Sequence, residues 1–201
     1  MRKVILAAFG ATAFGLSAPA TATQELVTNG GFETGDFGGW LQTGLTSRTV
    51  VCGSSCAHSG SLGAALGATF GTGTLSQVLT TIPGQSYDVS FWLANEPDLP
   101  IYSFDFRWGG GTRLSLGSGS GPFGYSLETF TLIATDTATQ IAFEFEHDRT
   151  FWYLDDVSVR ATSGVPELGT WTMLLLGFGT VGLALRRRRS GKIGEVGQLH
   201  A

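Results

Sequence analysis

Residues 87–93 read YDVSFWL, and apart from Trp92 their side chains alternate between apolar and polar. Alternation with a period of two is typical of a β-strand that buries one face. The same pattern recurs at 102–108, where aromatic residues alternate with polar ones, and at 141–146. We therefore expect three strands, each with one face in a hydrophobic core.

Working outward from these three strands, five more segments have strand character, at 25–29, 48–51, 74–82, 127–134 and 151–160. Glycine-rich turn signals separate them. Roughly eight strands between residues 23 and 162, with no convincing helix before residue 168, predict an all-β domain built as a two-sheet jelly-roll sandwich. The 30 glycines follow no three-residue period, so collagen is excluded, and a helical bundle does not fit.

Charge is unevenly distributed along the 201 residues. The chain has 12 Lys and Arg against 16 Asp and Glu, but the predicted sandwich holds only five arginines and no lysine. Nucleic-acid affinity comes largely from Lys and Arg that displace counterions from phosphates. The acidic body therefore predicts no nucleic-acid partner.

The first 22 residues have the three parts of a secretory signal peptide. Arg2 and Lys3 precede an apolar stretch from Val4 to Ala18, and small residues of the A-x-A type follow. The apolar stretch is shorter than the ~20 residues that a membrane span needs. We expect residues 1–22 to direct export and to be removed.

Residues 168–185 form a second, nearly uncharged stretch. Its 18 residues reach the lower limit of a transmembrane helix, about 17 to 25 residues. Four arginines follow it, and cytoplasmic flanks collect Lys and Arg. We expect one C-terminal transmembrane helix that holds the sandwich outside the cytoplasm, followed by a polar tail at 190–201; a buried core helix is the alternative.

Residues 163–189 resemble the PEP-CTERM sorting signal of Gram-negative bacteria. The resemblance rests on a short motif, a Gly/Leu-rich span and an arginine cluster, namely Val165, Pro166, Glu167 and then Arg186, Arg187, Arg188 and Arg189. It implies recognition by an exosortase-type processing enzyme in the inner membrane and delivery to the cell surface or the extracellular polysaccharide matrix. Leu168, where the family usually has proline, and the tail after the arginines depart from the pattern.

The central domain, residues 23–162, resembles the carbohydrate-binding-module 4/9-like, or galactose-binding-like, jelly-roll family. Four pieces in the same order as in the family carry the resemblance: LVTNGGFETG at 26–35, HSGS at 58–61, IPGQSYDVSFW at 82–92 and WYLDDVSV at 152–159. The resemblance implies the fold more strongly than it implies a sugar ligand, because one fold hosts many functions.

In relatives of this kind, carboxylates near the first and last strands often hold a structural calcium ion. Glu33 and the pair Asp155 and Asp156 occupy those places here. Calcium takes six to eight oxygen ligands, which carboxylates and backbone carbonyls supply. Structural calcium is therefore expected as a cofactor; the alternative is that these carboxylates accept hydrogen bonds from turn amides.

The alternation of side chains between the two faces of a strand indicates a candidate glycan-binding surface. If Phe91 faces the core, Trp92 points outward, and on a strand expected to be its neighbour Asp105 and Arg107 point outward too. An indole face suits a sugar ring, and carboxylate and guanidinium groups bind hydroxyls. The alternative is that this face packs on a loop or on the second sheet, with Trp92 in the core.

Few residues of the sequence indicate a metal, redox or catalytic site. Cys52 and Cys56 enclose three residues, which in an exported protein predicts a local disulfide and not a zinc or redox site. Glu144 and Glu146 share one strand face and could be imagined as a glycosidase pair, although a solvated strand face is the commoner explanation. We found no nucleophile elbow or zinc-protease motif.

Together these patterns predict an exported, non-enzymatic protein. It is expected to be anchored in the inner membrane, at least transiently, and then to bind or organise extracellular polysaccharide at the surface of a Gram-negative cell. A structural matrix or adhesion protein without sugar specificity is the alternative, and a glycoside hydrolase is a third.

Overall fold

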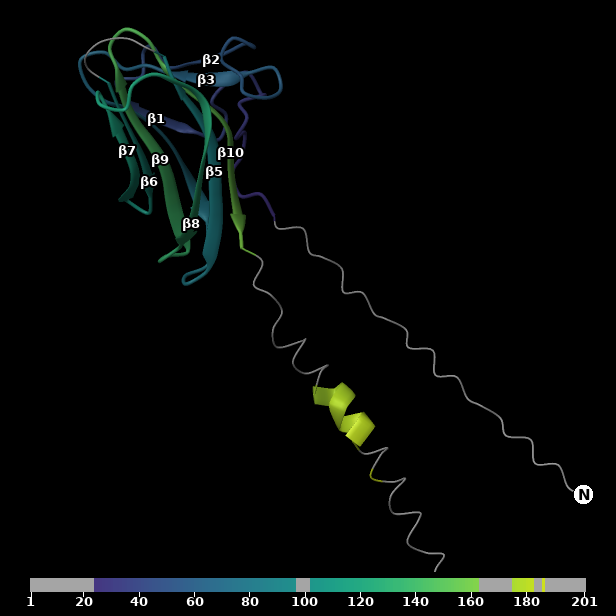
Figure 1. Cartoon of the computed structure of the whole chain (residues 1–201). Coiled ribbons are helices and arrows are strands. Elements are labelled where there is room, and N and C mark those ends of the chain that lie inside the picture. The colour runs from purple at the N-terminus through teal and green to yellow at the C-terminus, as the bar shows by residue number, and fades with distance from the viewer. Residues whose placement is uncertain (1–23, 97–101, 163–174, 183–185, 187–201) are drawn as a thin grey trace, which may run out of the picture.

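Two antiparallel sheets face each other (Figure 1), and one hydrophobic core lies between them. The computed structural model describes residues 24–96, 102–162, 175–182 and 186. The strands of this part are β1 (Leu41–Gly44), β2 (Val50–Cys52), β3 (Gly63–Leu66), β4 (Gly73–Thr80), β5 (Ser86–Asn95), β6 (Tyr102–Trp108), β7 (Gly111–Gly117), β8 (Phe123–Ile133), β9 (Ala138–His147) and β10 (Trp152–Ala161). The predicted jelly-roll sandwich is confirmed.

One sheet has the order β1-β4-β9-β6-β7 and the other β2-β3-β10-β5-β8. We call them the β9 sheet and the β10 sheet after their central strands. Consecutive strands β5 and β6 belong to different sheets, and so do β8 and β9. The chain therefore crosses repeatedly from one layer to the other, so sequence neighbours often lie on opposite outer faces.

Alternation in β5, β6 and β9 places their aromatic and aliphatic side chains between the sheets, as predicted. Phe91 of β5 is fully buried and contacts a cluster of phenylalanine rings at centroid distances of 5.1 to 6.3 Å, namely those of Phe104, Phe106, Phe130 and Phe143. Aromatic pairs at such distances add to the free energy of area burial. This cluster joins the two sheets.

The N-terminal segment differs from expectation. The strand expected at 25–29 is a single bridge between Glu25 and Arg160 of β10. The Glu25 carboxylate accepts hydrogen bonds from Ser158 Oγ, from the Val159 and Val27 amides and from Arg160 Nε. Burial raises the pKa of Glu25, but these hydrogen bonds outweigh it, so the pKa lies below its ordinary value. The Glu25 carboxylate, the Leu26 amide bound to the Val159 carbonyl and the Thr28 backbone bound to Gln77 thus hold the segment, and no strand ladder forms.

Three strands, β1, β3 and β7, were not predicted. β3 reads GAAL, and all four residues are buried, so it has no alternation to detect. β1 and β7 lie at the two edges of the β9 sheet and hold mostly exposed or half-buried residues. Edge strands of this kind resemble the turns beside them in composition.

Several predicted features lie outside the described residues. These are the signal peptide at 1–22, the sorting motif at Val165, Pro166 and Glu167, most of the arginine cluster and the tail at 190–201. Of the span predicted at 168–185, residues 175–182 are described, and they are helical. Within the described ranges no helix has the length and apolar character to cross a membrane.

Candidate functional site

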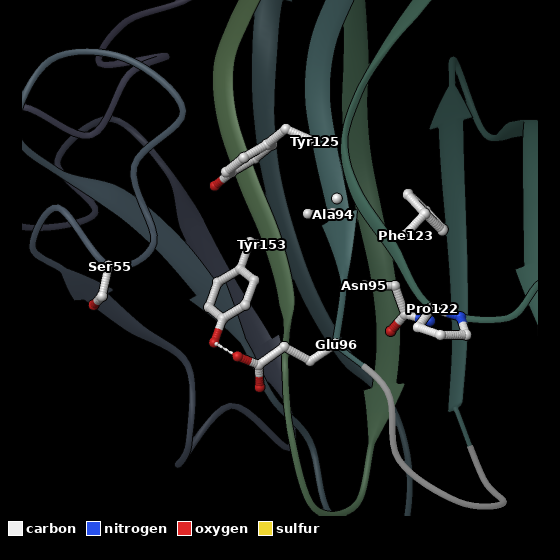
Figure 2. A pocket seen from close by; sticks show the side chains of 9 residues that line it. Ser55, Ala94, Asn95, Glu96, Pro122, Phe123, Tyr125 and Tyr153 are labelled. Atoms are coloured by element: carbon white, nitrogen blue, oxygen red, sulfur yellow. Dashed lines mark hydrogen bonds between the residues drawn. The ribbon is translucent and has the colours of Figure 1, made fainter.

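The outer face of the β10 sheet is hollowed near the end of β5. The cleft has a volume of about 440 Å³, which falls in the range of small-molecule sites, about 300 to 1,000 Å³. Figure 2 shows Tyr125 and Tyr153 on one side of it and Pro122 and Phe123 on the other. Strand β5 ends in this cleft at Asn95, and Glu96, the residue after the strand, supplies its carboxylate.

Both tyrosine hydroxyls of the cleft donate hydrogen bonds to the protein. Tyr153 donates to Glu96 Oε1 over 2.7 Å, and Tyr125 donates to the Cys56 carbonyl over 2.6 Å. Burial, together with the hydrogen bond and charge of Glu96, raises the pKa of Tyr153 to about 12. Burial, with the nearby charge of Asp155, also raises the pKa of Tyr125. Both phenols therefore stay neutral and fixed, so the aromatic rings are already held in position.

Asn95 is the unusual polar residue of the cleft. Its side chain is only 3% exposed. Its Nδ2 donates to the Gly121 carbonyl over 3.0 Å, while its Oδ1 has no hydrogen-bond partner among the described residues. A buried acceptor without a partner costs about 1 to 3 kcal/mol, and such groups gather at functional sites. Asn95 thus holds a buried acceptor without a partner behind the wall of the cleft.

Trp92 points outward from β5, as predicted, but one ring face is covered. The imidazole of His58 stacks on the indole with centroids 3.7 Å apart and planes at 13°, and Tyr125 meets His58 edge-on at 5.2 Å. His58 Nδ1 lies 2.7 Å from Asp156 Oδ2. This arrangement matches the alternative in which the face of Trp92 packs on a loop, and it makes Trp92 a support for the loop beside the cleft.

Asp105 and Arg107 lie on the opposite side of the molecule. The expectation that their strand neighbours that of Trp92 is wrong, because β6 belongs to the β9 sheet and β5 to the β10 sheet. Arg107 Nη1 is 2.9 Å from Glu144 Oε2 and Nη2 donates to the Gly110 carbonyl. The three residues therefore do not form one surface, and their role in glycan binding stays a prediction for two separate faces.

Glu33, Asp155 and Asp156 lie close together around Gly31, but within the described residues they form no group arranged to hold a metal ion. Asp155 is fully buried and accepts the His58 and Ser59 amides at Oδ2 and the Asp156 amide at Oδ1. Burial raises the pKa of Asp155, although these amides oppose the change. Glu33 Oε1 accepts two further amides, those of Ser61 and Leu62. The carboxylates hold the loop at residues 58–62, which was the alternative reading.

The Cys52–Cys56 disulfide is present, as predicted. It closes the loop that follows β2, and this loop supplies Ser55 to the wall of the cleft. Because the Cys56 carbonyl accepts the Tyr125 hydroxyl, the disulfide loop is attached directly to a cleft tyrosine. Its short ring limits the chain-entropy gain, so its main effect is local.

Sequence reasoning missed the cleft residues Asn95, Glu96, Tyr125 and Tyr153. Tyr153 lies in the quoted resemblance segment at 152–159, and it pairs with Ala94 across β10 and β5. Because side chains alternate between the two faces of a strand, Ala94 and Glu96 are expected to point outward like Trp92. This alternation could have indicated Glu96 as a residue of the outer face. The position of β8 beside β5, which brings Tyr125 to the cleft, could not be read from local patterns.

Neither a protein-family model nor a curated protein sequence matches this chain. Solved structures do match its fold. A family 61 carbohydrate-binding module solved with β-1,4-galactotriose aligns with a TM-score of 0.56 at 22% identity, covering 70% of this chain and all of that one. The CBM22-1 xylan-binding domain from Paenibacillus barcinonensis Xyn10C gives 0.53 at 15% identity, covering 73% and 100%.

The same fold also serves an enzyme. A cyclase from Fischerella sp. TAU in complex with 4-(1H-indol-3-yl)butan-2-one aligns with a TM-score of 0.52 at 16% identity, covering 69% of this chain and 98% of that one. At such identities the likeness establishes the fold, a two-sheet jelly roll, and not the ligand. The function has to be argued from the site.

Proposed function

We propose that this chain is an exported, non-enzymatic protein whose sandwich binds extracellular polysaccharide through the cleft at the end of β5. The observation that carries the proposal is the pairing of two fixed tyrosine rings with the Glu96 carboxylate in one hollow. A sugar presents an apolar ring face to aromatic side chains and hydroxyl donors to oxygen acceptors. The cleft offers both.

The structural neighbours favour this ligand class over others. Two of them are described as bound to β-1,4-galactotriose and as xylan-binding. The opposite face gives little support for hydrolysis, because Glu144, one of the two acids considered for a glycosidase pair, is held by Arg107. A polysaccharide ligand is therefore the best match for both the fold and the site.

Replacing Tyr153 by alanine should weaken binding of β-1,4-galactotriose or a xylan oligosaccharide about tenfold, since one ring contact contributes about 0.5 to 1.5 kcal/mol beyond area burial. Tyr153→Phe keeps the ring and should bind nearly as well as the parent. Isothermal titration of the three proteins measures the dissociation constants. Their melting temperatures show whether each variant is folded.

Arg107→Ala is the matched control, since Arg107 lies on the other sheet. It should leave affinity unchanged. If Arg107→Ala loses binding while Tyr153→Ala retains it, the sugar binds at the face of Asp105 and Arg107, and the assignment of the cleft as the binding site is wrong. Absence of binding across a glycan array would favour the structural matrix or adhesion protein, and release of reducing sugar would favour the hydrolase.

We also propose that export precedes binding. The signal peptide at 1–22 and the PEP-CTERM-like segment at 163–189 support delivery through the inner membrane by an exosortase-type enzyme to the surface of a Gram-negative cell. Intact-mass analysis of the native protein should find residues 1–22 removed and, if processing follows, a new C-terminus near Pro166. A full-length product among cytosolic proteins would contradict the proposal.

Structural calcium is kept as a proposal for the Glu33 cluster. No group of three or more His, Cys, Asp or Glu side chains within the described residues is arranged to hold a metal ion. Glu33 uses one oxygen for both amides, and Asp156 accepts from side chains that can turn away, so backbone oxygens would complete the set. Adding Ca²⁺ to chelator-treated protein should release heat and raise the melting temperature. If neither change is measured, the proposal that the protein binds calcium is wrong.

A further inference from the structure

A second hollow lies on the same outer face as the cleft. Its volume is about 270 Å³, and it lies between β5 and β8 where Asp88, Ser90, Thr129 and Thr131 line it. The strand register pairs Ser90 with Thr129 and Asp88 with Thr131. Thr131 Oγ1 donates to Asp88 Oδ1 over 2.9 Å. The hollow thus combines three hydroxyl groups and one carboxylate with the apolar residues Val89 and Phe130.

The row between the two hollows holds one cross-strand pair, and His58 stacks on its tryptophan. Trp92 pairs with Leu127 in the row between them. Leu127 is 47% exposed, although it is a large apolar residue. Ser90 and Ala94 are four residues apart along β5, which corresponds to about 13 Å at the rise of a strand. Two hollows that each combine polar and apolar groups therefore lie along the two strands, one on either side of exposed Leu127.

The charges of both hollows have the same sign. Glu96 in the cleft and Asp88 in the second hollow are acidic, and the described residues that line either hollow include no lysine or arginine. A polymer that carries uronate groups would meet like charges there, and like charges at close range are disfavoured. An uncharged chain with hydroxyls and apolar ring faces suits this surface.

We propose that the cleft and the second hollow are subsites of one track along β5 and β8, which binds an internal segment of an uncharged polysaccharide. This inference rests on the proposed function, since it extends the same site. The cleft holds one part of the chain, Leu127 contacts a sugar ring between the subsites, and the hydroxyls of Ser90 and Thr129 bind sugars farther along. Longer oligosaccharides therefore bind more tightly than short ones.

The test compares a disaccharide with a hexasaccharide of β-1,4-galactan and of xylan. The parent protein should bind the hexasaccharide of one series about tenfold more tightly, as two added hydrogen bonds would allow. The double variant Ser90→Ala with Thr129→Val keeps the shape of the strands but removes both hydroxyls. It should lose most of this preference while its affinity for the disaccharide is unchanged.

Thr112→Val supplies the control, because Thr112 is an exposed threonine on edge strand β7 of the other sheet. If the parent binds both lengths with equal affinity, the two hollows are not subsites of one track. The cleft as a binding site and the proposed function would still stand. Binding of an oligogalacturonate hexasaccharide as tight as that of the neutral one would overturn the choice of an uncharged chain. If neither length binds in either series, the cleft is not a binding site for these sugars, and the proposed function fails with it.

Discussion

Phe91→Ala should lower the free energy of unfolding by about 3 to 5 kcal/mol, the usual cost of truncating a buried phenylalanine to alanine. Phe91 has no exposed surface, and its ring contacts phenylalanines from both sheets, including Phe104 and Phe143. The truncation leaves a cavity between two layers of strands, which cannot close without bending a sheet. Urea denaturation followed by tryptophan fluorescence measures the loss as a lower midpoint with an unchanged slope.

Phe70→Ala is the matched control for this prediction. Phe70 is 89% exposed, so the same substitution removes no buried area and should change the unfolding free energy by no more than about 0.5 kcal/mol. Equal effects of the two substitutions would mean that the aromatic cluster does not hold the sheets together. The domain would then need another explanation for its stability.

Asp155→Ala should destabilise the domain by about 3 kcal/mol, because it removes the acceptor of three backbone amides at once. Leaving a buried donor without a partner costs about 1 to 3 kcal/mol. The amides of His58, Ser59 and Asp156 all depend on this carboxylate. Denaturation at neutral pH measures the loss, and hydrogen exchange should show faster exchange at His58 and Ser59.

The substitution should also weaken sugar binding, since the loop after the disulfide carries His58 against Trp92 and Tyr125. Asp136→Ala removes an exposed carboxylate in a loop and should change neither stability nor binding. Slow exchange retained at His58 and Ser59 in Asp155→Ala would show that the loop is held by something else. The assignment of Asp155 as its anchor would then be withdrawn.

Local patterns predicted every described strand except β1, β3 and β7, and they predicted which residues of β5, β6 and β9 face inward. Phe91, Phe104 and Phe143 are buried as their alternation required. Alternation reports the orientation of a side chain relative to its own sheet, but it does not say which sheet a strand joins. For that reason Trp92 and Arg107 were both correctly expected to point outward and were wrongly expected to point to the same surface.

The convergence of Glu33 with Asp155 and Asp156 could be predicted, because it follows from the closeness of the first and last segments of this fold. The cleft could not, because its walls come from β5, β8, β10 and the disulfide loop. Bringing Tyr125 beside Tyr153 depends on the order of strands in the β10 sheet. That order is a long-range property which no single stretch of sequence contains.

The bridge between Glu25 and Arg160 has a consequence for how the domain is displayed. It places the entry and the exit of the sandwich next to each other, where Ala161 pairs with Tyr87. Tyr153 of the cleft lies seven residues back along β10 from Arg160, or about 23 Å at the rise of a strand. A tether continuing from residue 162 would therefore hold the domain at the end opposite the cleft and leave the cleft facing the surroundings.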